Sequence, residues 1–327
     1  MSVLSQPQFH DEAKAFAFLE SVLWADGIVC PHCGVVGGRV YDLSDVRGSK
    51  SKKNPEGAIR HGLKKCGECR KQFTVKVGTV FEHARMPLHK MLQAVHLIVS
   101  SKKGISAHQL HRVLEVQYKS AWFLAHRIRE AMRTGDLFPF GSDGGVVEVD
   151  ETFLGVDPDY TAPEGKRAKG TPSMMKVLSL VERNTGRKHS VVIDKVSAST
   201  IWDVIGENIA REAFLMTDDG VSYKSLADNF AGHGVVKHRH GEYVSRFNPA
   251  LHTQTVEGSF SIFKRGMRGI YQHCSKKHLH RYLAEFDFRY SNRSATGIED
   301  RQRAVVALQG ITGKRLTYAR SGVGAEA

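Results

Sequence analysis

The stretch VVEVDETFLG, residues 146–155, decides the fold class of this chain. It is rich in β-branched and aromatic residues, which favour strands, and it stands where the pattern changes from helices to strands. The segments after it predict further elements in this order: strands over 173–183 and 187–196, a helix over 199–210, strands over 213–219 and 234–240, and helices over 253–267 and 276–293.

These elements indicate an α/β fold. The first three strands form a meander, in which the turn Asn184-Thr185-Gly186 joins the second strand to the third, and helices and strands then follow. A mixed sheet flanked by helices in this order is the layout of an RNase H-like core, which we assign to residues 144–295. Residues 296–327 are expected to form a C-terminal tail that frays at its end, SGVGAEA.

Three carboxylates stand where this layout makes them converge. Asp150 ends the first strand, Asp218 ends the fourth, and Glu257 lies near the start of a helix. Acids that approach one another repel unless a cation neutralises them, and Mg²⁺ prefers carboxylate oxygens. The three positions therefore suggest a two-metal site for phosphoryl transfer. Acidic residues at strand ends are equally typical of turns and helix caps, so spacing alone leaves both interpretations open.

Two CxxC pairs lie upstream of this core, Cys30 with Cys33 and Cys66 with Cys69. Four thiolates are the ligand set of a tetrahedral structural zinc, and the alternating residues 70–75 after the second pair are typical of a zinc ribbon. The 32 residues between the pairs exceed the usual spacing, so a hairpin or a flexible insert is expected there. We assign the ribbon to residues 28–84. Redox-active or unliganded thiols are the alternative.

The most basic stretch of the chain runs from Arg47 to Lys76 and holds ten Lys or Arg and two Glu. Cationic side chains beside a zinc ribbon favour contact with phosphates, which dominate non-specific affinity for DNA. A solvated loop is the alternative. The candidates for DNA contact in this stretch are Lys52, Lys53, Arg70 and Lys71.

Residues 85–135 are helical in pattern. Apolar residues recur at helical spacing over 88–99, a second helix begins at the capping residue Ser106, and a third follows after a short turn. This size and order resemble a helix-turn-helix unit, which would place residues 119–133 on DNA, with Arg127 as a candidate contact. A helical connector packed on its neighbours is the alternative.

Composition narrows the function classes. The 327 residues are 41% hydrophobic and 25% charged, which is ordinary for a globular protein and argues against wholesale disorder. No apolar run is long enough for a membrane span, and residues 1–27, which are expected to be helical, lack the pattern of a secretory signal. The net charge of +13 favours a polyanionic partner such as nucleic acid.

Five stretches within residues 28–294 are specific in combination: CPHCG, CGECRKQFTVKVGTVFE, VEVDETFLG, MTDDGVSYKSL and HTQTVEGSFSIFKRGMRGIYQHCSKKHLHRYLAEFDFRYSNR. Through them the chain resembles the bacterial DDE-type insertion-sequence transposases that carry an N-terminal zinc ribbon. This ISXO-like group is akin to the eukaryotic Merlin transposases. The resemblance implies an RNase H-like fold, two Mg²⁺ or Mn²⁺ ions, and the cutting and joining of DNA at the ends of a mobile element.

The resemblance also implies roles for single residues. Asp150 stands in the family's VDET context and is implied to be the first catalytic acid. Asp218, with Tyr223 after it, matches the family's TD…Y pattern and is implied to be the second, although its neighbour Asp219 competes for this role. Glu257, in the EG…K context, is implied to be the third. These three acids would be the magnesium ligands.

Basic residues follow the third acid. Lys264 lies seven residues after Glu257, two helical turns on, so both share a helix face on which a cation can hold a phosphate. Arg265 is a second candidate DNA contact, and solvated helix residues are the alternative for both. Members of the family often have Asn where this chain has Gln254, a departure that puts an amide-specific role there in doubt and leaves the metal ligands unchanged.

Other side chains near the motifs are interpreted as structural. Glu148 and Glu151 flank Asp150 and are expected to point to the other face of the strand. Cys274 has no cysteine partner and is expected to be a buried thiol. Packing or surface roles are expected for three histidines, His252, His273 and His278. Of these, His252, immediately before TQTVE, is the best candidate for a contact with DNA or with the site.

Together these features predict a DNA transposase with one structural Zn²⁺. It would cleave 3′ ends at the terminal inverted repeats of double-stranded DNA, and the freed hydroxyl would attack target DNA with no covalent protein–DNA intermediate. The family implies a homodimer or higher oligomer on DNA, and a cytoplasmic, nucleoid-associated location is expected. The alternatives are a catalytically silent DNA-binding protein derived from a transposase, and an RNase H-like nuclease.

Overall fold

The computed structural model describes residues 2–52, 54–133, 138–162, 164, 170–223, 229–237, 244 and 248–317. They fall into two compact units, described separately below. The first unit consists of Met1–Ser101, Ile105–Met132 and Asp300–Ala327, and the second of Lys102–Gly104 and Arg133–Glu299. Three expectations concern residues that the structure does not describe: the DNA contact at Lys53, the strand end at 238–240 and the frayed end of the tail at 321–327.

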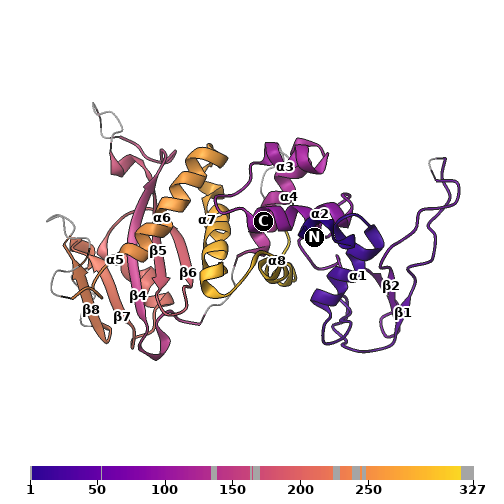
Figure 1. Ribbon diagram of the computed structural model, residues 1–327, viewed down its shortest axis with the longest axis horizontal. Helices are drawn as coiled ribbons and strands as arrows, with labels where there is room; N and C mark the ends of the chain where they lie inside the picture. The colour runs from indigo at the N-terminus through magenta and orange to yellow at the C-terminus, as the bar shows by residue number, and fades with distance from the viewer. Residues whose placement is uncertain are drawn as a thin grey trace. The chain divides into compact units, whose positions relative to one another are not determined.

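The second unit is built on a five-stranded mixed sheet (Figure 1). Its strands are β4 (Val146–Leu154), β5 (Met175–Glu182), β6 (Lys188–Ile193), β7 (Phe214–Asp218) and β8 (Gly232–Val236), in the order β6-β5-β4-β7-β8. The meander β4-β5-β6 is antiparallel, whereas β7 and β8 run parallel to β4. This order is that of an RNase H-like sheet and confirms the predicted α/β fold.

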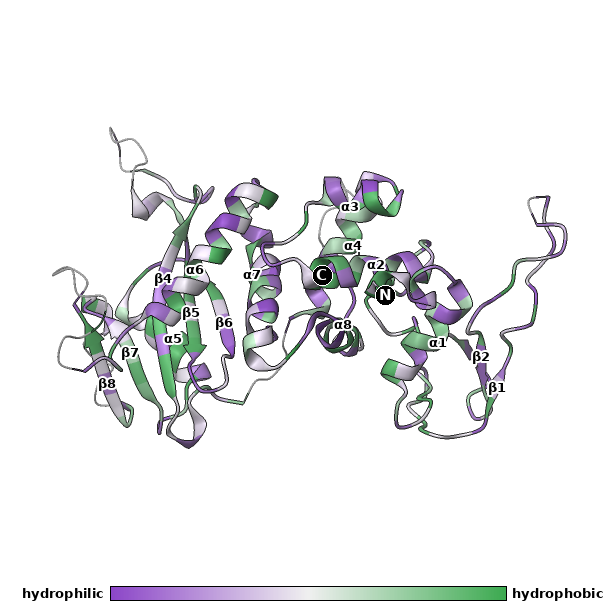
Figure 2. Cartoon of the chain, viewed as in Figure 1, coloured by the Kyte–Doolittle hydropathy of each residue, from purple (hydrophilic) through white to green (hydrophobic). Residues whose placement is uncertain are grey.

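Helices cover both faces of this sheet. On one face α5 (Ala198–Asn208) packs its Ile201 and Ile205 against Val147 and Val149 of β4. On the other face lie α6 (Gln254–Gly266) and α7 (Lys276–Ser291), whose apolar side chains cover the odd-numbered residues of β5. Because both faces are buried, β5 is apolar along most of its length, as its green colour in Figure 2 shows.

The first unit carries a small antiparallel sheet of β1 (Val40–Asp42), β2 (Lys64–Cys66) and β3 (Gln72–Phe73). Between β1 and β2 the chain continues as a hairpin arm, residues 43–63, with bridges between Arg47 and Ile59 and between Ser51 and Asn54. The arm makes up most of the chain between the two cysteine pairs. Of the two forms expected there, a hairpin and a flexible insert, the structure has the hairpin.

The first unit also contains four helices from the N-terminal part of the chain: α1 (Glu12–Leu23), α2 (Leu88–Ser100), α3 (Ala107–Leu114) and α4 (Tyr118–Ala131). The predicted cap is confirmed, because Ser106 Oγ accepts the Gln109 N–H at 3.1 Å. Glu115, in the left-handed conformation, ends α3 and turns the chain into α4. No helix among the described residues is long and apolar enough to cross a membrane.

One C-terminal element differs from expectation. Residues 296–327 were expected to form a tail, yet α8 (Asp300–Gln309) is a helix that packs on α2. The Arg303 guanidinium is buried and donates to the Val99 carbonyl at 3.2 Å. The sequence of α8 is polar and only weakly amphipathic, so its pattern does not reveal a packed helix.

Short helical turns complete the chain. The 3-10 turns are η1 (Val3–Ser5), η2 (Pro7–Phe9), η3 (Ser142–Gly144), η4 (Thr171–Ser173), η5 (Val221–Tyr223) and η9 (Ser294–Thr296), and η8 (Met267–Tyr271) is a π-helical turn.

Candidate active site and zinc site

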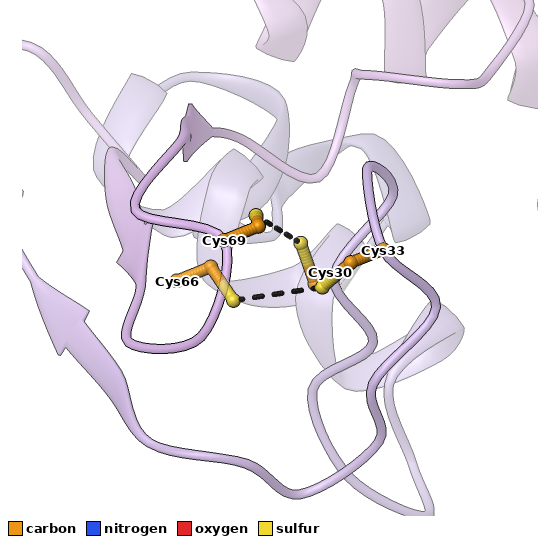
Figure 3. Close-up of side chains that lie close together, drawn as sticks. All are labelled: Cys30, Cys33, Cys66 and Cys69. Atoms are coloured by element: carbon orange, nitrogen blue, oxygen red, sulfur yellow. Dashed lines mark hydrogen bonds between the residues drawn. The ribbon is translucent and has the colours of Figure 1, made fainter.

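The four predicted zinc ligands meet in the first unit (Figure 3). Their sulfur atoms lie within 4.8 Å of one another, with Cys30 3.7 Å from Cys69 and Cys33 3.8 Å from Cys66. A tetrahedral zinc with Zn–S bonds of about 2.3 Å requires sulfur atoms about 3.8 Å apart, whereas a disulfide requires about 2 Å. The geometry therefore fits a structural zinc ion and excludes a disulfide.

In the absence of metal, the electrostatics of the first knuckle favour a thiolate at Cys30 and a thiol at Cys33. The Val35 N–H lowers the pKa of Cys33, but burial and the neighbouring cysteines outweigh it and raise this pKa to about 11. Burial opposes ionisation of Cys30, but the N–H groups of His32 and Cys33 lower the pKa of this thiol to about 6. Hydrogen bonds with neighbouring thiols act in the same direction. A zinc ligand must be deprotonated, so at Cys30 the backbone already stabilises the state that binds the metal.

The three candidate catalytic acids come from three elements of the second unit. Asp150 lies in β4 on the face covered by α6, Asp218 ends β7, and Glu257 lies in the first turn of α6. Burial raises the pKa of Asp150 to about 8, and the charges of Glu151, Asp218 and Glu257 add to the effect. The Asp218 Oδ1 accepts the Gly220 N–H at 2.9 Å, which fixes that carboxylate at the strand end.

This donor set fits hard divalent cations. Carboxylate oxygens are the ligands that Mg²⁺ and Mn²⁺ take, and a buried acid among other acids is stabilised by a cation. Among the described residues, however, only the four cysteines bring three or more potential ligand atoms within 4.8 Å of one another. The charges of Asp218 and Glu257 act on the pKa of Asp150, although the ligand atoms of the three acids do not all lie within 4.8 Å of one another.

The two glutamates beside Asp150 lie on opposite faces of β4. Glu151 faces the α5 side, where the burial of Tyr223 raises the pKa of this tyrosine and the charge of Glu151 raises it further. Glu148 does not point to the other face, as was expected, but lies on the same face as Asp150. A strand repeats every two residues, so positions 148 and 150 must share a face.

Glu148 is completely buried and joins β4 to the start of α6. One of its oxygens accepts the Val256 N–H at 2.9 Å, and the other accepts the Arg183 Nε at 2.5 Å. The same guanidinium donates to the Ala250 carbonyl at 2.6 Å and also to the His252 carbonyl. Sequence reasoning missed Arg183, because no local motif marks a partner that is far away in the chain.

Thr253 is a second residue that the sequence did not reveal. It is the N-cap residue of α6, but its side chain caps no N–H of the helix. Instead the hydroxyl donates to Glu257 Oε1 at 2.8 Å, and Thr253 itself is fully buried. The only available signal was its position four residues before Glu257, one helical turn away.

The candidate DNA-binding residues differ in accessibility. Lys52, at the tip of the hairpin arm, is exposed, as are Arg70, Lys71 and Arg265. Lys264 is half-buried, and Lys53 lies outside the described residues. Arg127 is half-buried, stacks on Phe123 and donates to the Glu82 carbonyl at 3.0 Å, so the fold already engages its guanidinium.

The third helix of the predicted helix-turn-helix region, α4, exposes few residues. Half of its residues are buried, and the exposed ones are Tyr118, Lys119 and Ser120 at the start of the helix. The expected DNA contact along residues 119–133 is therefore limited to its first turn and to the exposed Arg133 at its end.

The remaining side chains lie as follows. His252 is half-buried, and its Nδ1 is 3.1 Å from the Arg183 Nη2. His273 is exposed, whereas His278 is half-buried and lies beside Arg281 at 2.8 Å. Cys274 is half-buried, not fully buried as was expected, because it lines an open cavity.

Comparison with known proteins identifies two domains. Residues 144–291 match the family model of the ISXO2-like transposase domain, and residues 10–72 match that of the transposase zinc-ribbon domain. The chain is 26% identical over 301 residues to an uncharacterized protein in the transposable element ISH50 of Halobacterium salinarum. This match covers 86% of the chain and 91% of the relative.

Two solved structures give partial matches to this chain. A chain of the simian T-cell lymphotropic virus intasome matches with 12% identity and a TM-score of 0.30, covering 72% of this chain and 78% of that one. A chain of a pre-cleavage Mos1 transpososome matches with 13% identity and a TM-score of 0.27, covering 67% and 78%.

Proposed function

We propose that Asp150, Asp218 and Glu257 are the catalytic acids of this chain. The premise is that the chain is a DDE-type DNA transposase, with an ISXO2-like transposase domain and a transposase zinc ribbon. The three acids would bind two Mg²⁺ or Mn²⁺ ions. The enzyme would cleave 3′ ends at the terminal inverted repeats of its element and join them to target DNA.

The observation that supports this proposal best is that the fold brings the three acids close enough for Asp218 and Glu257 to add to the effect of burial on the pKa of Asp150. They come from β4, β7 and α6, elements far apart in the chain, yet Asp218 and Glu257 both act on the pKa of Asp150. A fold that brings carboxylates near one another carries an electrostatic cost, and a bound divalent cation would offset it.

The residues of the chain would act as follows. Asp150, Asp218 and Glu257 would orient the ions and, through them, the scissile phosphate. The Glu151 N–H donates to Asp150 Oδ1 at 2.8 Å and so would hold that carboxylate in place. When bound, the two ions activate the attacking oxygen and stabilise the leaving one. No Ser or Tyr nucleophile is then needed.

We further propose that exposed basic residues hold the DNA. Lys52 of the hairpin arm, its sequence neighbour Lys53, and Arg70 and Lys71 would contact phosphates near the zinc ribbon. Lys264 and Arg265 would contact the element end near the acids. Two ends must be cut together, so a homodimer or higher oligomer would assemble on the DNA, in the cytoplasm at the nucleoid.

The test is a cleavage and strand-transfer assay with purified, zinc-loaded protein and duplexes that carry the repeats flanking its gene. We expect products in Mg²⁺ or Mn²⁺, and none from Asp150→Ala, Asp218→Asn or Glu257→Gln. Asp219→Asn is the matched control for the second acid, and Asp203→Asn, an exposed position on α5, is the control for loss of a carboxylate elsewhere.

Each other outcome has a definite meaning. Full activity of Asp150→Ala would refute the assignment of the acids. Tight binding of the repeats by the wild type without cleavage would indicate a silent DNA-binding protein. Metal-dependent cleavage with no joining and no preference for repeat ends would indicate a nuclease.

A further inference from the structure

We propose that Glu148, Arg183 and Thr253 are positioning residues that hold the third acid, Glu257, in register with the first acid, Asp150. This inference rests on the proposed function, because it concerns the same acids. It assigns a role in metal binding to three residues that touch neither the ions nor DNA.

The first part of the arrangement is a helix cap supplied from the sheet. The first turn of a helix leaves N–H groups without partners, and a side chain at the N-cap normally satisfies one of them. In α6 the N-cap residue does not do so, and the carboxylate of Glu148 accepts the Val256 N–H instead. A negative charge at this end is also favoured by the helix dipole.

This cap joins two residues that lie next to or two positions from a catalytic acid in the sequence. Glu148 stands two residues before Asp150 on the same face of β4, and Val256 directly precedes Glu257. One hydrogen bond of 2.9 Å therefore links the backbone of the third acid to the strand of the first. Shifting or rotating α6 along the sheet would break this bond, so the bond fixes where Glu257 stands.

Arg183 secures the cap from the end of β5. Its guanidinium pairs with Glu148 and holds the carbonyls of Ala250 and His252, the residues that lead into α6. A buried carboxylate needs such a partner, because an unpaired charge in the interior is strongly unfavourable. The Arg183 side chain thereby connects the segment that precedes α6 to Glu148, which caps this helix from β4.

Thr253 then sets the orientation of the carboxylate itself. Because Glu148 caps the helix, the Thr253 hydroxyl is available to donate to Glu257 Oε1 at 2.8 Å. Outer partners of this kind fix the rotamer of a metal ligand, and removing one typically lowers metal affinity by about 10- to 100-fold. The two residues therefore have different roles, since Glu148 places the helix and Thr253 orients the side chain of Glu257.

The test measures Mn²⁺ affinity by calorimetry on the full zinc-loaded chain, without DNA. We expect Thr253→Val, which keeps the side-chain shape and loses the hydroxyl, to weaken Mn²⁺ binding by about tenfold or more. Thr253→Ser should restore affinity to within about twofold, because the hydroxyl returns. Glu148→Gln should also weaken Mn²⁺ binding, because an amide cannot pair with Arg183 as a carboxylate does.

Matched controls come from β6 and α7 on the same face of the sheet, two strands away from Asp150. The Ser190 hydroxyl also donates to a buried carboxylate at 2.8 Å, that of Asp287, and Asp287 also pairs with a buried cation, Lys188. Ser190→Ala and Asp287→Asn therefore remove comparable interactions far in sequence from the three acids. They should lower thermal stability without changing Mn²⁺ affinity.

The outcomes separate this inference from the proposed function. If Asp150→Ala abolishes Mn²⁺ binding while Thr253→Val binds as the wild type does, the positioning role is wrong and the metal site stands. A loss of affinity in Ser190→Ala as large as that in Thr253→Val also overturns the positioning role. If Asp150→Ala leaves Mn²⁺ binding unchanged, the proposed site fails and the inference falls with it. Should Glu148→Gln not fold, the Thr253 pair still decides.

Discussion

Single side chains set part of the pH response of the first unit. His96 is buried in α2, its ring centroid lies 5.8 Å from that of Phe9, and no described residue offers its Nδ1 a hydrogen bond. Burial lowers the pKa of His96 from its ordinary value of 6.5, although the charge of Asp300 acts in the opposite direction. The unfolded chain therefore binds a proton more readily at this position than the folded chain does.

From this we predict how stability changes with pH. The contribution of neutral His96 is complete above about pH 6.5 and is lost as the pH falls further, because protonation then favours the unfolded state. Chemical unfolding of His96→Gln should show a smaller loss of stability than the wild type between about pH 7 and pH 5. His83→Gln, at an exposed position, is the control and should follow the wild type. Equal losses in His96→Gln and wild type would contradict the prediction.

Single residues also differ in how well the sequence predicted their role in the sites. The cysteine cluster was predictable, because two CxxC pairs carry the chemistry of a zinc site. The three acids stay a prediction, and Asp150, which was expected to end its strand, lies in the middle of β4 because the pairing with β5 continues to Leu154. The face of Glu148 was predictable from the strand period and was nevertheless assigned wrongly. The partnership of Glu148 with Val256 joins residues 108 positions apart, and no local pattern encodes a contact of that range.

At the scale of elements, the hairpin arm is the least supported part of the first unit. Nearly all of its described residues between Asp45 and Arg60 are exposed, and among these residues the two sides of the arm are paired only by isolated bridges. A two-stranded ribbon without a covering layer is marginally stable by itself. Its basic residues therefore contribute little to folding and are available for a polyanion.

Replacing residues 47–59 of the arm by a short Asn-Gly turn should weaken DNA binding and leave the zinc content unchanged, because the cysteines lie outside the arm. The slope of log affinity against log salt should fall by about 0.9 for each phosphate that the protein no longer neutralises. Filter binding at several salt concentrations measures the slope. A full-length arm with Lys50→Gln and Lys52→Gln separates charge from length. An unchanged slope in both variants would rule out phosphate binding by the arm.

Elements also differ in how well the sequence predicts them. β4 and α2 were predicted within about two residues at each end, since an apolar strand and an amphipathic stripe are strong local signals. α8 was missed because it is held by Arg303 and by packing on α2, and not by a pattern of its own. The strand at β8 begins two residues earlier than predicted, because its pairing with β7 starts at Gly232 opposite Phe214.

At the scale of the whole molecule, the two units should respond separately to loss of zinc. Trp24 lies in the cluster around Cys30 and Cys66, with its ring centroid 5.9 Å from that of Phe73. Trp202 packs against the core of the second unit. Because metal binding at a structural zinc site is coupled to folding, removing the ion should disrupt the surroundings of Trp24 alone.

Two variants with one tryptophan each test this prediction. In Trp122→Phe/Trp202→Phe a zinc chelator should change the fluorescence of Trp24, and excess Zn²⁺ should restore it. In Trp24→Phe/Trp122→Phe the same treatment should leave the fluorescence of Trp202 constant. A parallel change of both signals would mean that the second unit depends on zinc as well.

The place of α8 in the chain has a consequence for how the protein is made. The first unit includes α8, and the ribosome completes α8 only after the entire second unit has been synthesised. Domains generally fold while the chain is being synthesised. Part of the apolar face of α2 therefore stays uncovered until α8 has been made. A truncated translation product keeps that face exposed and is a substrate for proteases. We therefore expect broken copies of the gene to yield short-lived fragments that do not compete with the intact protein for the repeats.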